Sequence, residues 1–185
     1  RIPQRLFDGF LLAFAAVATQ RIQLGTAIAV AFPRSPMVVA NTAWDLQTNS
    51  QGRFALGLGP QVKGHNERRF SVPWSPPVPR LREYIEALRA IWRCWEQGSP
   101  LHYEGEHYRF TLMTPEFSPP ASGLPPIPVT IAAVGEKMLR LAGRDWYVVY
   151  TPGHTEDHIC LHDPADGIFL AGDHVLPTIT PHISG

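Results

Sequence analysis

The alternation of apolar and polar positions predicts a strand, a helix and a second strand in the first third of the chain. Residues 22–32 are nearly all apolar, which is typical of a strand buried on both faces of a parallel sheet. Ser35 followed by Pro36 signals a helix N-terminus, and the predicted helix runs to about Asn49. Residues 53–58 form the next predicted strand. This order is that of a right-handed βαβ unit.

The clearest helix in the pattern covers residues 80–97. Its apolar residues recur at spacings of three and four along one face, and Gly98 is placed to end it. Residues 60–79 are predicted to be a polar, proline-rich loop, residues 101–118 a short hairpin and residues 127–133 another buried strand. The helix face predicted to enter the core consists of Leu81, Tyr84, Ile85, Leu88, Ile91, Trp92 and Trp95.

An apolar run near the start of the chain predicts a buried helix over residues 10–19. Arg1 and Arg5 precede this run, so a short secretory signal is the alternative interpretation. Asp8 interrupts the positive region and the run leads directly into the next predicted strand, which favours a buried barrel helix. The run is too short to span a bilayer, so we expect no membrane segment here.

The pattern changes in the last quarter of the chain. Residues 146–151, 158–162 and 167–171 predict three short strands separated by tight turns. Such a pattern is β-rich and does not continue the strand–helix alternation. We therefore predict a boundary at about 143/144, with domains over residues 1–143 and 144–185.

Charge supports this division and narrows the classes of partner. The 185 residues carry 16 basic and 16 acidic side chains, and this zero net charge argues against binding to nucleic acid or to an anionic membrane surface. Residues 144–185 hold six of the acidic side chains and five of the eight histidines, but only one arginine. The two cysteines cannot form a disulfide framework, which fits a reducing, cytoplasmic location.

Several motifs over about residues 8–143 resemble the luciferase-like monooxygenase superfamily, and most closely its deazaflavin (coenzyme F-420)-dependent oxidoreductases. The motifs are RIQLGTAIAVAFPRSP at 21–36, GRFALGLG at 52–59, His65 with RRF at 68–70, and GEHY at 105–108. The resemblance implies an α/β fold, a partial (β/α)8 barrel of the TIM type. It also implies a deazaflavin or FMN cofactor bound at the carboxyl-terminal ends of the strands.

By position, the resemblance also assigns the cofactor site and a non-prolyl cis peptide bond between Ala27 and Ile28. His65 is a weak candidate for acid–base chemistry, and a solvated loop histidine is its alternative interpretation. Glycines after a strand equally serve the close packing of neighbouring strands. The residues assigned to the cofactor pocket are Thr26, Ala27, Ile28, Gly57, Gly59 and Gly135.

The last forty residues resemble a β-rich fragment of an αββα metallo-hydrolase, the metallo-β-lactamase fold. The resemblance rests on TPGHTEDH at 151–158 and GIFLAGDH at 167–174. It implies that His154 is a terminal ligand and Asp173 a bridging ligand of a Zn²⁺ site, where bound water would become a nucleophile. The alternative is that these two side chains only hydrogen-bond the turns in which they lie.

Three functions stay open on the sequence. The first is an oxidoreductase of the luciferase-like class, which transfers hydride between deazaflavin or FMN and a small-molecule substrate. The second is a metal-dependent hydrolase. The third is an inactive chimeric or truncated fragment, because the chain begins at Arg1 and neither family's complete set of site residues is present. The open sheet edges of a partial barrel would also favour an oligomer.

Overall fold

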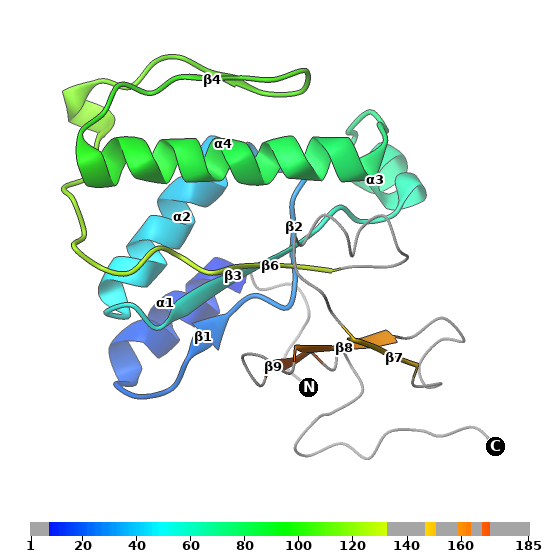
Figure 1. The fold of residues 1–185 in the computed structure, drawn as a ribbon, viewed down its shortest axis with the longest axis horizontal. Helices are drawn as coiled ribbons and strands as arrows, with labels where there is room; N and C mark the ends of the chain where they lie inside the picture. The colour runs from blue at the N-terminus through cyan, green and yellow to red at the C-terminus, as the bar shows by residue number, and fades with distance from the viewer. Residues whose placement is uncertain (1–7, 133–146, 151–158, 164–167, 171–185) are drawn as a thin grey trace. The chain divides into compact units, whose positions relative to one another are not determined.

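The computed structural model of the chain describes residues 8–132, 147–150, 159–163 and 168–170. The chain divides into two compact units, residues 1–132 and 133–185 (Figure 1). The boundary predicted at 143/144 falls outside the described residues.

A parallel sheet forms the centre of the first unit. β3 (Phe54–Gly59) is its middle strand, with β1 (Leu24–Gly25) and β2 (Ala29–Val30) along one edge and β6 (Val129–Ile131) along the other. This arrangement confirms the expected parallel strands. Within the described residues, the outer edges of β1, β2 and β6 pair with no further strand. Association of chains through these edges stays a prediction.

The two helices that pack together beside the sheet were both predicted (Figure 1). α2 (Pro36–Asn49) begins where the Ser35 hydroxyl accepts a hydrogen bond from an amide of its first turn. α4 (Pro77–Gln97) ends at Gly98, whose φ of 64° is in the left-handed region that glycine adopts without strain.

Aromatic side chains join α2 to α4. The rings of Trp44 and Trp95 meet edge to face with their centroids 5.4 Å apart. The Trp92 indole donates a hydrogen bond to the Ala40 carbonyl at 3.2 Å, so this buried N–H has a partner. The prediction that Trp92 and Trp95 enter the core is therefore confirmed, and Trp44 is buried with them.

α3 (Lys63–Arg69) corrects the prediction that residues 60–79 form a loop throughout. The helix has only seven residues and no side-chain cap, so the sequence carries no start signal for it. Asn66 explains its presence, because this fully buried side chain donates to the Pro60 carbonyl at 2.9 Å and ties the helix to the end of β3. Beyond α4, β4 (Tyr103–Glu104) and β5 (Arg109–Phe110) form the predicted hairpin. A short 3₁₀ helix, η1 (Pro115–Phe117), follows.

α1 (Asp8–Ala18) confirms the predicted helix but not its predicted burial. Phe10, Phe14 and Val17 are 65 to 72% exposed, whereas Ala16 is buried. The physical reason is that α1 packs through only one part of its surface, where Ala16 is buried and Leu12 partly buried, and no described element covers Phe10, Phe14 or Val17. Within the described part of the chain, every helix is too short or too polar to cross a bilayer.

Arg53 fixes α1 to the start of β3. Its guanidinium donates to the main-chain carbonyls of Ala16, Thr19, Ile22 and Ser50 at 2.7 to 3.0 Å. Two of these carbonyls lie at the end of α1, where helical partners are missing. One charged side chain thus satisfies the end of the helix and holds it to the sheet.

The second unit contains a three-stranded antiparallel sheet in the order β7 (Tyr147–Tyr150), β8 (Ile159–Asp163), β9 (Ile168–Leu170). Val149 is paired with Cys160, and Leu161 with Leu170. These strands match the three that the sequence predicts.

Candidate functional site

The candidate cofactor segment is the connection between β1 and β2, residues 26–28. The Thr26 hydroxyl donates to the Gly57 carbonyl at 2.7 Å and accepts from the Gly57 amide at 2.8 Å. One side chain thereby replaces the main-chain bonds that the two strands would make at this point. The peptide bond between Ala27 and Ile28 is cis, as the resemblance implied.

Gly57 and Gly59 let this segment approach β3 closely. A Cβ atom at Gly57 would collide with the Thr26 carbonyl oxygen. A Cβ atom at Gly59 would lie only 2.7 Å from the Cδ1 atom of Ile28. Protein atoms therefore fill the space beside both glycines, which is the close-packing interpretation. A direct contact of either glycine with a cofactor stays a prediction.

The surface above these glycines is formed by their neighbours. Ala27 and Ile28 are exposed on one side of β3, and Thr130 is exposed on the other side, where it pairs with Gly57. The Thr130 Oγ1 atom lies 3.2 Å from the position that a Gly57 Cβ would occupy. We call Ala27, Ile28 and Thr130 the sheet surface. Sequence reasoning missed Thr130, and only the register of β6 against β3 places it here.

The sheet surface fits a flat, partly apolar ring. It offers a methyl group and a branched alkyl side chain beside the carboxyl-terminal half of β3. Ligands of α/β folds bind near the carboxyl-terminal ends of parallel strands. A threonine hydroxyl supplies a hydrogen-bond donor and acceptor on the same surface. Binding pockets for organic cofactors combine these features, mostly apolar walls with few polar groups.

α4 holds the chain that leaves β2. The buried Tyr84 hydroxyl donates to the Arg34 carbonyl at 3.1 Å, and the Arg80 guanidinium stacks over the Phe32 ring at 4.4 Å. Arg80 Nε also donates to the Tyr108 hydroxyl at 3.1 Å. Burial raises the pKa of Tyr84 far above its usual range, so the hydroxyl stays protonated and remains a donor.

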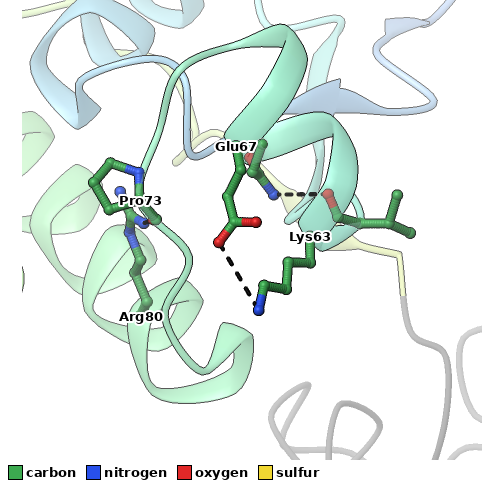
Figure 2. Close-up of polar contacts among 6 residues, drawn as sticks. Lys63, Glu67, Pro73 and Arg80 are labelled. Atoms are coloured by element: carbon green, nitrogen blue, oxygen red, sulfur yellow. Dashed lines mark hydrogen bonds and ion pairs between the residues drawn. The ribbon is translucent and has the colours of Figure 1, made fainter.

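His65 lies on α3, just after β3, with an exposed side chain. Figure 2 shows the neighbouring contacts, an ion pair of 4.0 Å between Lys63 and Glu67, and Arg80 bonded to the Pro73 carbonyl at 3.2 Å. The role of His65 in acid–base chemistry stays a prediction. The remaining predicted site residues, Gly135, His154 and Asp173, lie outside the described residues.

Comparison of the sequence with known proteins identifies the family to which this chain belongs. The family model of the luciferase-like monooxygenases matches residues 9–159, and the chain therefore belongs to this family. The match continues past the predicted join at 143/144 and includes His154, so it gives no support to a change of family at that point.

The relatives include proteins with two different cofactors. An uncharacterized protein of Mycobacterium tuberculosis is 54% identical over 74% of the chain and 40% of its own length. The coenzyme F-420-dependent tetrahydromethanopterin reductase of Methanopyrus kandleri is 25% identical, with a TM-score of 0.55 over 73% of the chain and 41% of the reductase.

A type II Baeyer–Villiger monooxygenase of Pseudomonas putida, solved with FMN, shares the fold. It is 20% identical, with a TM-score of 0.56 over 74% of the chain and 41% of the enzyme. The chain thus spans about two fifths of the length of the relatives it matches.

Proposed function

We propose that the chain carries part of the cofactor site of an oxidoreductase that uses coenzyme F-420 or FMN to transfer hydride to or from a small-molecule substrate. The observation that carries this proposal is the sheet surface, where exposed Ala27 and Ile28 are held against β3 by Thr26. Membership of the luciferase-like family supports it, because relatives in that family work with one or the other cofactor.

Each residue of the site has a separate task in this proposal. Ala27 and Ile28 lie against one face of the ring and keep water from it. Thr26 fixes their position through its two bonds to Gly57, and Thr130 offers a hydroxyl to the polar edge of the ring. When bound, the deazaflavin or flavin supplies the hydride chemistry, and the protein supplies orientation and a dry surface.

Equilibrium binding tests the proposal. The purified chain is titrated with F-420 and, separately, with FMN, and the fluorescence of each cofactor is followed. We expect one of them to bind, and Ala27→Trp to weaken that binding more than tenfold because an indole would occupy the ring's place. Ala121→Trp is the matched control, since Ala121 is an exposed alanine in a distant loop.

Two results would contradict the proposal. One is the failure of both cofactors to bind at tens of micromolar to a chain that circular dichroism shows to be folded. The other is an equal effect of the Ala27→Trp and Ala121→Trp substitutions, because binding would then lie elsewhere. The cofactor that binds also decides between the deazaflavin and FMN branches.

The metal-dependent hydrolase stays a weaker hypothesis, since no described residue supports it. Its two candidate ligands, His154 and Asp173, would have to retain zinc through dialysis. Loss of zinc in His154→Ala would favour the hydrolase, whereas a metal-free wild-type chain would remove this hypothesis.

A further inference from the structure

A group of two carboxylates and an imidazole lies away from the sheet surface, where the β4–β5 hairpin runs beside α4 (Figure 1). Glu83 comes from α4, and Glu106 and His107 come from the turn of the hairpin. One carboxylate oxygen from each glutamate and one imidazole nitrogen all lie within 4.8 Å of one another. Two elements distant in sequence thus bring three donor atoms of two kinds to one point.

The fold holds this point in place. The His107 amide donates to Glu83 Oε2 at 2.8 Å, which fixes the carboxylate beside the turn. A Cβ atom at Gly105 would collide with the same oxygen, so the Glu83 carboxylate would have to move if Gly105 carried a side chain. One turn further along α4, the Tyr103 hydroxyl donates to Glu86 at 3.0 Å and docks the hairpin a second time.

Glu83 and Glu106 have no ion-pair partner among the described residues. Glu104, by contrast, pairs with Arg109 at 2.9 Å. Like charges so placed repel one another unless a cation joins them.

We propose that Glu83, Glu106 and His107 bind a divalent transition-metal ion, for which Zn²⁺ is the best match. Carboxylate oxygen and imidazole nitrogen are zinc ligands, and a water molecule would complete four-coordination. Glu106 is exposed and the other two side chains are partly exposed, so the ion can enter from solvent. These three residues belong to the first unit and are different from the sequence-predicted ligands His154 and Asp173.

Bound zinc would join the hairpin to α4. A ligand that binds only the folded chain stabilises it by mass action, so zinc should raise the unfolding temperature of the chain. The hairpin also carries Tyr108, which bonds Arg80 beside the chain leaving β2. This contact connects the hairpin that carries two of the proposed ligands to α4. The proposal does not depend on cofactor binding.

Calorimetric titration with zinc chloride tests the proposal. All proteins carry His154→Ala and Asp173→Ala, so that zinc cannot bind at those residues. We expect one zinc ion per chain, and at least about tenfold weaker binding in each of Glu83→Gln, Glu106→Gln and His107→Gln, the loss found even for outer-shell partners of a metal. The matched controls are Glu104→Gln and His102→Gln, which change the same residue types in the same hairpin region outside the group.

Absence of zinc binding, or binding that the three substitutions and the two controls change equally, would overturn the proposal. A nuclear magnetic resonance titration keeps the test decisive if a variant fails to fold. In the double-substituted background, zinc should shift the amide resonances of Glu106 and His107 before any others. Shifts confined to other residues would equally contradict the site.

Discussion

α4 and α1 are both helices that the apolar pattern predicts, but they relate to the rest of the molecule in opposite ways. α4 is amphipathic, and residues such as Leu88 and Ile91 on its apolar face are fully buried. α1 is apolar on all sides, and Phe14 on its surface is 70% exposed. A period of three and four therefore predicts which face of a helix is buried. An unbroken apolar run predicts the helix but not what covers it.

The two helices are also held to the rest of the first unit by different kinds of interaction. Apolar side chains and edge-to-face aromatic rings hold α4 against α2. Polar bonds from Arg53 hold α1, whose Phe10 and Phe14 rings lie mostly in water. We expect the two helices to respond differently to substitution of apolar and of polar residues.

The largest expected effect is on α4. Leu88→Ala should lower the free energy of unfolding by about 2 to 5 kcal/mol, because it removes buried methyl groups and leaves a cavity. Phe14→Ala in α1 should change it by less than about 0.5 kcal/mol, since that ring is mostly in water already. Urea unfolding of both variants measures the difference. Equal costs would mean that α1 is covered in solution.

Arg53→Met should release α1 from the sheet. Four main-chain carbonyls lose a charged donor, and we expect a loss of about 2 to 3 kcal/mol in the free energy of unfolding. Hydrogen exchange should rise first in the amides of α1. Arg109→Met is the control, because its exposed ion pair with Glu104 is worth at most about 1 kcal/mol. Unchanged exchange in α1 would mean that its apolar residues hold the helix.

Tyr84→Phe tests the polar contribution of α4. The substitution keeps the buried ring but removes the hydrogen bond to the Arg34 carbonyl, and we expect a loss of about 1 kcal/mol in urea unfolding. It should also speed hydrogen exchange at the amides of Phe32 and Arg34. Loss of stability without faster exchange there would indicate that the hydroxyl does not position this part of the chain.

The smallest effect concerns pH and the end of α4. A hydrogen bond from the Ser122 hydroxyl, and after it the backbone amides of Ser122 and Gly123, lower the pKa of Glu96 below its ordinary value of 4.5. The carboxylate therefore stabilises the fold above pH 4.5, and this contribution is lost as the pH falls through the lowered pKa. Glu96→Gln should show a smaller loss of stability than wild type between pH 6 and 3 in urea unfolding. Parallel curves would contradict this assignment.

The sequence predicts much of the fold because local signals agree with it. Ser35 with Pro36 and the left-handed Gly98 mark the ends of α2 and α4, and both signals are intrinsic to the backbone. α3 could not be predicted, since the buried Asn66 that holds it acts only once β3 has placed the Pro60 carbonyl. The exposure of α1 depends on which elements surround it, which no local pattern records.

The candidate site was predictable only in part. Residues 26–28 could be assigned by resemblance, and the cis bond lies where it was expected. Gly57 leaves room for the Thr26 carbonyl, and Gly59 leaves room for the Ile28 side chain. These two contacts can be recognised only in the three-dimensional packing. Thr130 lies more than seventy positions from Gly57 in the sequence, and only the pairing of β6 with β3 brings it to the same surface.

The central claim is that the sheet surface binds the cofactor, and hydrogen exchange with and without the bound cofactor measures this most directly. Addition of F-420 or FMN should slow exchange at the amides of residues 26–28 and 57–59, while α1 and the β4–β5 hairpin stay unchanged. Protection confined to other segments, or none at saturating cofactor, would contradict the account.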